Sequence, residues 1–217
     1  MKTLHSLSDI NMATVILCGG KSSRLNGEDK ALLKYNFNKT FIEKIIEECG
    51  RKVFISVSNK NKYLSLLNNY NNIDFIEDIY KDIGPLSGIY SSFEKLGSDY
   101  IQFLSCDTPS VNKNFLEYMK DFSDDYHDAF IPVYNDKPYY LCSIYSKKIL
   151  NIIKENIENK KYRIKDLIDK IKAKYINLKY TIFNLININT HEDYSSFQKT
   201  MPQYFAICGK RNSGKTT

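Results

Sequence analysis

The sequence contains few of the residues that crosslink a chain or break it up. Its five cysteines are odd in number and form no C-x-x-C pair, which argues against a disulfide framework and against a zinc site. Nine glycines and five prolines among 217 residues exclude a collagen-like or low-complexity chain. No run of about 18 apolar residues occurs, so no segment is predicted to span a membrane. The three histidines lie in unrelated segments, and no Ser-His-Asp set is visible.

The remaining composition is that of an ordinary globular protein. Hydrophobic residues make up 42% of the chain and charged residues 26%. A chain of this length buries about 70% of its unfolded surface, so it needs neither a disulfide nor a metal to fold. The net charge of +6 is spread along the chain, which suits a polyphosphate pocket better than a nucleic-acid partner. Residues 1–11 are polar and lack an apolar signal core, so we expect a cytoplasmic protein.

Strand-like and helix-like segments alternate through the first half of the chain. Apolar runs predict strands at 13–17, 52–57, 73–77 and 100–104, with helices at 40–50, 63–70 and 84–96 between them. Thr40 with Glu43 forms a capping box, and Gly50 and Gly97 are expected to end their helices. This order implies right-handed crossovers and an α/β fold with a mostly parallel sheet.

The second half is less regular. We expect helices at 114–122, 149–157 and 163–171, and strands at 129–134 and 139–145 joined by the turn 135–138. An extended segment is predicted at 180–185, and Thr190 with Asp193 should begin a last helix that runs to Gln198. The strands of this half are expected to pair antiparallel at one edge of the sheet.

The loop after the first strand carries the strongest chemical signal. Gly19 and Gly20 follow Leu17 and Cys18 directly, and adjacent glycines let backbone amides approach phosphate oxygens. Arg24 and Lys30 add two positive charges within ten residues of that pair. The loop matches neither G-x-G-x-x-G nor a Walker sequence. We therefore favour polyphosphate binding over the alternative, a tight turn with exposed basic residues.

An aspartate follows the strand 100–104. Asp107 stands in Cys106-Asp107-Thr108-Pro109, and Pro109 forces the chain out of the sheet. A carboxylate at such a strand end suits Mg²⁺, which takes one or two carboxylates and completes its coordination with phosphate and water. The equally weighted alternative is that Asp107 caps the following turn.

Asp78 ends the strand 73–77 on the same edge. Gly84-Pro85-Leu86-Ser87-Gly88 follows it and opens a helix whose amino end favours an anion. Asp78 could accept a hydrogen bond from a guanine ring or a ribose hydroxyl, or it could assist a metal. The alternative, a solvated aspartate before a helix start, is equally weighted.

These segments together resemble the molybdenum cofactor guanylyltransferases, a family of nucleotidyltransferases. The likeness runs from about Ala13 to Gln198. Leu17 to Lys30 stands where the family has L-A-G-G-x-S-x-R-M-G-x-D-K, with Cys18 for Ala and Leu25 for Met. The later matches are Glu77-Asp78, Gly84 to Gly88, Cys106 to Pro109, Pro138 to Leu141 with Tyr145, and Asn187-Ile188-Asn189-Thr190.

The resemblance implies a three-layer Rossmann-like fold, with helices on both faces of a twisted, mostly parallel sheet. It implies transfer of GMP from GTP to the phosphate of molybdopterin, with Mg²⁺ as cofactor. Other cofactor-biosynthesis proteins and acceptor molybdoenzymes would be further partners. The residue roles it implies are catalysis by Arg24, Lys30 and Asp107; nucleotide binding by Leu17, Cys18, Gly19, Gly20, Lys30, Ser56, Asp78 and Asp107; metal binding by Asp107; and an acceptor side at Asn187 and Asn189.

Several functions remain open at this point. Within the same chemistry, the chain could be a cytidylyltransferase of the same cofactor or a sugar-phosphate nucleotidyltransferase, because a few loop contacts decide the base. In another class it could be a non-catalytic nucleotide-binding module that serves cofactor delivery. The presence of Arg24, Lys30, Asp78 and Asp107 favours the enzyme.

The carboxyl end holds a second motif. Gly209 to Thr216 matches the Walker sequence G-x-x-x-x-G-K-T after a strand-like run, and the printed sequence stops one residue later. It resembles the start of the GTP-binding adaptor protein of the same pathway. We divide the chain into an extension at 1–11, a nucleotidyltransferase domain at 12–200 and a truncated P-loop stub at 201–217. The stub is expected to bind no nucleotide, and a P-loop GTPase function is disfavoured.

Overall fold

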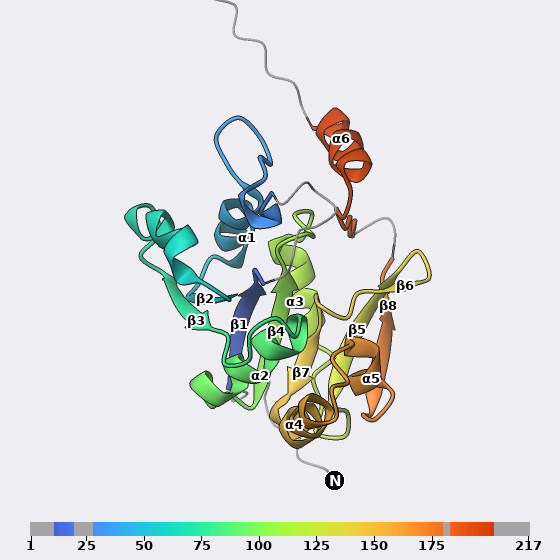
Figure 1. Ribbon diagram of the computed structural model, residues 1–217. Coiled ribbons are helices and arrows are strands. Elements are labelled where there is room, and N and C mark those ends of the chain that lie inside the picture. The colour runs from blue at the N-terminus through green and yellow to red at the C-terminus, as the bar shows by residue number, and fades with distance from the viewer. Residues whose placement is uncertain (1–10, 20–27, 180–182, 202–217) are drawn as a thin grey trace, which may run out of the picture.

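A mixed, mostly parallel β-sheet forms the centre of the molecule. The computed structural model describes residues 11–19, 28–179 and 183–201. Within them an eight-stranded sheet has the order β3-β2-β1-β4-β7-β5-β6, and β8 pairs with β5 (Figure 1). The strands are β1 (Met12–Leu17), β2 (Val53–Val57), β3 (Ile73–Glu77), β4 (Tyr100–Ser105), β5 (Ala129–Tyr134), β6 (Lys137–Pro138), β7 (Ile144–Ser146) and β8 (Ala173–Asn177).

The pairing of the strands confirms the predicted mixed topology. The first four strands run parallel to one another, with β1 between β2 and β4. β7 lies antiparallel between β4 and β5, β6 is antiparallel to β5, and β8 is parallel to β5. The carboxyl ends of β1, β3 and β4 therefore meet at one edge of the sheet, where ligands bind in open α/β sheets.

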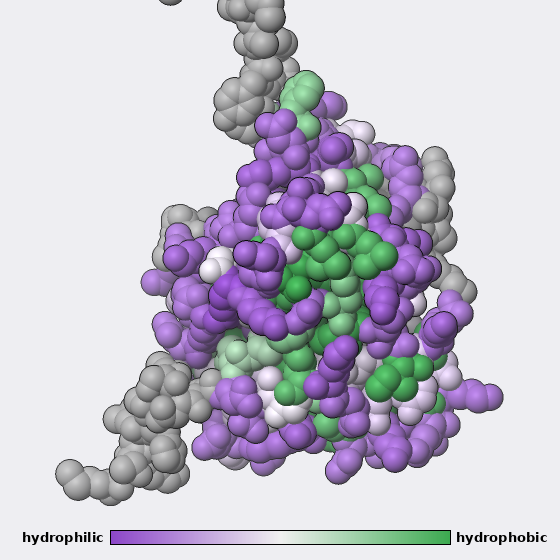
Figure 2. Space-filling model, turned by 90° about the vertical axis from the view of Figure 1, so that its left-hand side faces the viewer, coloured by the Kyte–Doolittle hydropathy of each residue, from purple (hydrophilic) through white to green (hydrophobic). Residues whose placement is uncertain are grey.

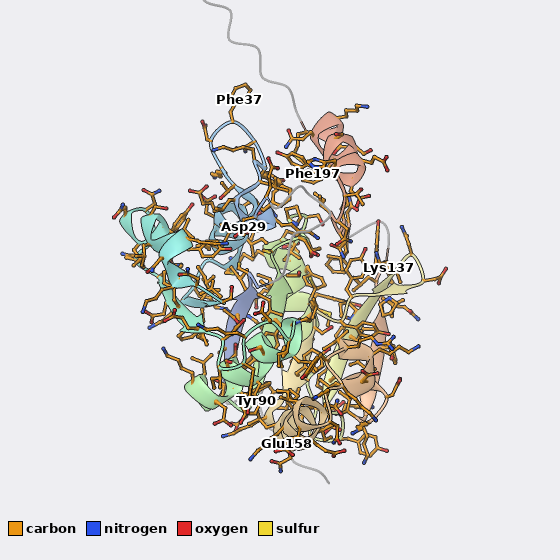
Figure 3. The ribbon with its side chains drawn as sticks, in the orientation of Figure 1. Asp29, Phe37, Tyr90, Lys137, Glu158 and Phe197 are labelled. Carbon is orange, nitrogen blue, oxygen red and sulfur yellow. The ribbon has the colours of Figure 1, made fainter. Side chains whose placement is uncertain are left out.

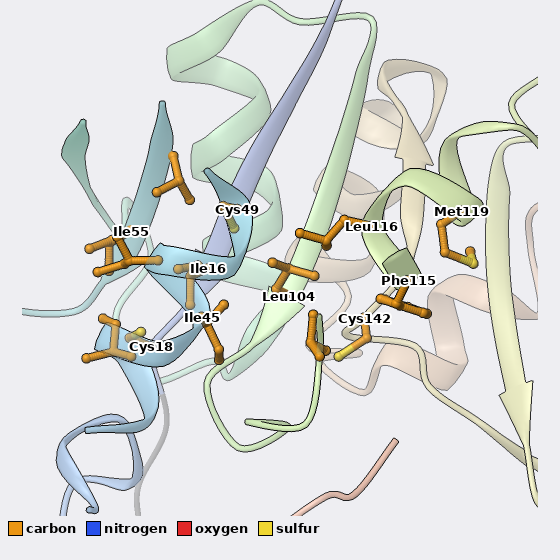
Figure 4. Packing of buried hydrophobic residues seen from close by; sticks show 14 of the residues in the cluster. Ile16, Cys18, Ile45, Cys49, Ile55, Leu104, Phe115, Leu116, Met119 and Cys142 are labelled. Atoms are coloured by element: carbon orange, nitrogen blue, oxygen red, sulfur yellow. The ribbon is translucent and has the colours of Figure 1, made fainter. Parts of the chain in front are cut away.

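Helices cover both faces of the sheet and make three layers. α1 (Phe41–Cys49) and α3 (Lys113–Lys120) pack on the face that carries Ile16 and Leu104 (Figure 4). α2 (Pro85–Leu96), α4 (Leu150–Glu158) and α5 (Ile164–Ile168) pack on the opposite face, which carries Val15 and Phe103. The strand residues alternate between the two cores because successive side chains point to opposite faces. The three-layer α/β expectation is confirmed.

Local signals fix most of the element ends where the sequence predicts them. The capping box of Thr40 and Glu43 is formed, and Gly50 ends α1 at a φ of 59°. Gly97 ends α2 at a φ of 62°, a left-handed conformation that glycine adopts without a steric penalty. A second capping box, made by Thr190 and Asp193, begins α6 (His191–Thr200), which lies beyond the sheet at the top of Figure 1.

Three predicted elements differ in detail from the structure, and one strand was not predicted. The helix expected at 63–70 is a 3₁₀ helix, η4 (Lys60–Asn68). The strand expected at 139–145 forms only as β7, because the chain first turns, with the Cys142 amide bonded to the Tyr139 carbonyl at 3.0 Å. β8 was missed because its residues alternate polar and apolar weakly, and Tyr175 is exposed. Short 3₁₀ turns also stand at Lys30–Leu32 (η3) and Lys147–Ile149 (η5), and α5 is shorter than predicted.

Some predicted segments form no regular element or lie outside the described residues. Residues 183–185 form no regular strand, and 180–182, the extension at 1–10 and most of the P-loop segment lie outside the described residues. No helix within the described ranges is long and apolar enough to cross a bilayer.

Figure 2, which faces the side on the left of Figure 1, shows hydrophobic residues gathered in a band between hydrophilic ones. Exposed large apolar side chains on η4 and just after β3 are Leu64, Leu67 and Ile79.

Candidate active site

A lysine and an aspartate that are far apart in the sequence form an ion pair at the carboxyl ends of the central strands. The Lys30 Nζ lies 3.3 Å from the Asp107 Oδ2 and 2.8 Å from the Asn189 Oδ1. Lys30 comes from η3, Asp107 follows β4, and Asn189 precedes α6. The side chains of Lys30 and Asp107 are 19% and 18% exposed, so the pair is reachable from solvent. A cation, a carboxylate and an amide thus converge on one point.

The carboxylate of Asp107 is held in place from several directions. Ser105 donates its hydroxyl to the Asp107 Oδ1 at 2.6 Å, and Thr108 donates to the same oxygen at 3.4 Å. The Ile188 amide donates to the Asp107 backbone carbonyl at 2.8 Å, which places Asn189 beside Lys30. The next helix is capped by Asn112, so Asp107 is not the cap of that helix.

A second group surrounds Asp78. The Ser56 hydroxyl donates to the Asp78 Oδ1 at 2.9 Å. A Cβ added at Gly19 would lie 3.3 Å from the Asp78 Oδ2, so the backbone at Gly19 passes close to the carboxylate. The two groups are connected through the end of β1, because the Cys18 amide donates to the Ser56 carbonyl at 2.9 Å and the Cys106 amide donates to the Leu17 carbonyl at 3.2 Å.

Gly88 leaves no room for a larger side chain at the amino end of α2. A Cβ at this position would lie 2.6 Å from the Ser56 Oγ and 2.9 Å from the Leu17 Cδ2. Alanine has the higher helix propensity, by about 1 kcal/mol. Overpacking costs about 1–3 kcal/mol, so we expect Gly88→Ala to destabilise the protein in urea unfolding. Glu94→Ala, on the exposed part of the same helix, should change stability by less than about 0.5 kcal/mol. A stabilised Gly88→Ala variant would contradict this packing.

Burial raises the pKa of Asp78, and the hydrogen bond from Ser56 opposes that rise. A carboxyl whose folded pKa is raised binds more protons in the native state, so stability falls as pH rises above the unfolded value of about 3.9. We expect Asp78→Asn to melt at a higher temperature than the parent at pH 7 and to lose that advantage below about pH 4. It should also bind nucleotide more weakly. Thermal melts from pH 3.5 to 8 test this, and a variant less stable at pH 7 would contradict it.

A cavity opens next to Asp107 on the side of β5 and β7. It has a volume of about 200 Å³, and its lining includes Lys137, Tyr139, Tyr140 and Asn187. The Asn187 Oδ1 is buried and has no hydrogen-bond partner among the described residues. Such an atom costs free energy unless a ligand or water satisfies it. Figure 3 shows Lys137 at the same end of the molecule as Asp29, the neighbour of Lys30, and away from Tyr90 and Glu158.

The structure brings most of the predicted residues to this edge. Lys30, Asp107 and Asn189 meet directly, and Asn187 lines the adjoining cavity. Leu17, Cys18, Gly19, Ser56 and Asp78 form the second group. Gly20 and Arg24 lie outside the described residues.

Two residues with a part in this arrangement were not singled out from the sequence. Ser105 holds Asp107, and its place two residues before the aspartate at a strand end was a usable signal. Tyr63 contacts Asp29, and no sequence pattern indicates that contact.

Comparison with known proteins identifies relatives over most of the chain. Residues 14–174 match the family described as the MobA-like NTP transferase domain. A Clostridium perfringens protein named probable molybdenum cofactor guanylyltransferase is 32% identical over 200 residues, covering 88% of this chain and 98% of that protein.

Two solved structures share the fold. Molybdopterin-guanine dinucleotide biosynthesis protein A from Archaeoglobus fulgidus superposes with a TM-score of 0.73 at 21% identity, covering 87% of this chain and 97% of that one. CTP:phosphocholine cytidylyltransferase from Streptococcus pneumoniae gives a TM-score of 0.62 at 19% identity, with 88% and 99% covered.

Proposed function

The chain belongs to the MobA-like NTP transferase family, and on that premise we propose that it transfers GMP from GTP to the phosphate of molybdopterin and releases pyrophosphate. The family makes the chain a nucleotidyltransferase, and the relative in Clostridium perfringens supports the choice of cofactor by its name. The observation that carries the proposal is the meeting of Lys30, Asp107 and Asn189 beside a cavity at the carboxyl ends of the strands.

The reaction needs positioning and charge neutralisation more than covalent help from the protein. A terminal phosphate oxygen of molybdopterin forms a bond to the α-phosphorus of GTP, and the bond from that phosphorus to the oxygen bridging to the β-phosphate breaks. Negative charge gathers on the departing pyrophosphate. Lys30 lies beside Asp107 and would bind phosphate oxygens there, and we assign Arg24 to the same charge. Asp78 and Ser56 would contact the guanosine.

Mg²⁺ fits this edge as a partner of the nucleotide. No group of three His, Cys, Asp or Glu side chains in the described ranges could hold a metal by itself. Mg²⁺ needs only one or two carboxylates when phosphates and water complete its coordination. Asp107 would supply such a carboxylate, and the Lys30 ammonium would then move from the Asp107 Oδ2 to a phosphate oxygen. The ion, when bound, would supply positive charge to the leaving group.

The cavity beside Asp107 suits the acceptor. Tyr139 and Tyr140 offer aromatic rings and Lys137 offers a cation. Asn187 offers a buried side-chain carbonyl oxygen that has no partner within the described part of the chain. This set can bind a flat, polar ring system that carries a phosphate. The cytidylyltransferase and sugar-phosphate alternatives use the same chemistry with another base or acceptor, and a non-catalytic module would bind nucleotide without turnover.

Pyrophosphate release with molybdopterin as acceptor tests the proposal. We expect release with MgGTP, slower release with MgCTP or MgATP, and none without acceptor. Faster release with CTP would support the cytidylyltransferase. A sugar phosphate that replaces molybdopterin as the preferred acceptor would support the sugar-phosphate enzyme. Binding of GTP with no release from any acceptor would favour the non-catalytic module.

We further propose that 12–200 is the transferase domain and that 201–217 begins a P-loop segment like that of the pathway's GTP-binding adaptor. The match of Gly209 to Thr216 supports this assignment. Titration calorimetry should find one GTP bound per chain, because the P-loop segment is expected to bind none. Two equivalents would contradict that expectation.

A further inference from the structure

Tyr63 is a buried tyrosine whose hydroxyl reaches toward the active-site edge. It lies on η4 and is 2% exposed. Its hydroxyl donates to the Asp29 Oδ2 at 2.6 Å and lies 3.4 Å from the Cys18 carbonyl oxygen. Cys18 and Asp29 flank the glycine loop on its two sides in the sequence. A single hydroxyl therefore lies between the end of β1 and the start of η3.

Asp29 uses its two carboxylate oxygens for different partners. The Oδ1 accepts the Ala31 amide at 3.1 Å, which makes Asp29 the N-cap of η3. The Oδ2 accepts the hydroxyl of Tyr63. Lys30, the first residue of η3, sits directly between Asp29 and Ala31 in the chain. The orientation of the turn that presents Lys30 therefore depends on how the Asp29 carboxylate is held.

The hydroxyl of Tyr63 is suited to donate a lasting hydrogen bond to the Asp29 carboxylate. Burial raises the pKa of Tyr63 well above its usual value, and the neighbouring Cys18 and Asp29 raise it further. The phenol therefore keeps its proton and acts as a hydrogen-bond donor. A hydrogen bond to a charged group contributes more than one between neutral groups. The contact joins η4, which follows the carboxyl end of β2, to the turn that carries Lys30.

We propose that Tyr63 is a positioning residue, which acts through Asp29 to hold Lys30 where it meets the phosphates of the nucleotide. This inference rests on the proposed function, because it takes Lys30 as the phosphate-binding cation. Tyr63 itself touches no substrate in this account. Its effect should therefore disappear when the Lys30 side chain is removed, whereas a tyrosine that only stabilises the fold would affect both backgrounds equally.

A double-mutant cycle with Tyr63→Phe and Lys30→Ala tests the proposal. The phenylalanine keeps the buried ring and removes only the hydroxyl. We expect Tyr63→Phe to lower kcat for GMP transfer about tenfold in the parent protein, as the loss of a hydrogen bond to a charged group predicts. In the Lys30→Ala background it should cause less than a twofold further loss. Tyr100→Phe removes a buried hydroxyl that donates to the Asp124 carbonyl at the other end of β4, and it should leave kcat unchanged.

The outcomes separate this inference from the proposed function. An unchanged kcat in Tyr63→Phe, or an equal loss in both backgrounds, would overturn the positioning role while transfer by the parent protein stands. If the parent transfers no GMP, the proposed function fails, and the same cycle on the Kd of MgGTP still decides the role of Tyr63. Asp29→Asn provides a second variant should Tyr63→Phe fold poorly. It retains an oxygen for the cap and loses the negative charge, so its effect on kcat or Kd should also vanish without Lys30.

Discussion

Asp107→Ala should lower the kcat of GMP transfer by a hundredfold or more. The carboxylate is fixed by Ser105 and Thr108 and lies against Lys30, at the point where the triphosphate and its metal are expected. Loss of one preorganised contact of this kind typically raises a reaction barrier by about 2.7–4 kcal/mol. Steady-state pyrophosphate release at saturating MgGTP and molybdopterin measures the effect.

A matched control lies at the opposite end of the same strand. Asp99 is exposed just before β4, and Asp99→Ala should leave kcat within about twofold of the parent. Circular dichroism should show both variants folded. If Asp107→Ala turned over at nearly the parent rate, Asp107 would have no part in the mechanism.

Lys30→Ala should also lower turnover by a hundredfold or more, for a different reason. The Lys30 ammonium is the described cation closest to Asp107, and it would neutralise charge on the leaving pyrophosphate. The substitution also removes the 2.8 Å contact with Asn189. Because the interaction strengthens as charge develops, the loss should fall mainly on kcat rather than on KM.

Lys34→Ala is the matched control for Lys30→Ala. Lys34 follows η3 and is exposed, so its removal changes the net charge by the same amount without touching the site. It should leave turnover within about twofold of the parent. If both lysine variants lost activity to the same small extent, general charge attraction would explain the effect and Lys30 would have no special role.

The parts of the site that could be predicted from the sequence are those that stand at strand ends. Asp78 and Asp107 follow apolar runs, and the alternation of strands and helices implies a parallel sheet that gathers those ends on one edge. The sequence alone therefore predicts that both aspartates stand on the same edge of the sheet. The contact of Lys30 with Asn189 could not be predicted from the sequence. It joins residues 159 positions apart and depends on where the last segment crosses the sheet.

The missed features share a physical cause. Tyr63 lies in a 3₁₀ segment whose pattern is weakly amphipathic, and only tertiary packing directs its hydroxyl to Asp29. β8 pairs at the side of β5 away from β7, where one face of a strand can remain polar and the hydrophobic pattern fades. The strand expected at 139–145 begins with apolar residues that line the cavity beside Asp107 instead.

Transfer of label from GTP tests the central claim most directly. The protein is incubated with molybdopterin, Mg²⁺ and GTP that carries ³²P at either the α- or the γ-position. The account predicts that α-label appears in the dinucleotide product and that γ-label appears only in pyrophosphate. Asp107→Ala should slow the appearance of both by a hundredfold or more, whereas Asp99→Ala should not. Absence of α-label from the product, or undiminished transfer by Asp107→Ala, would contradict it.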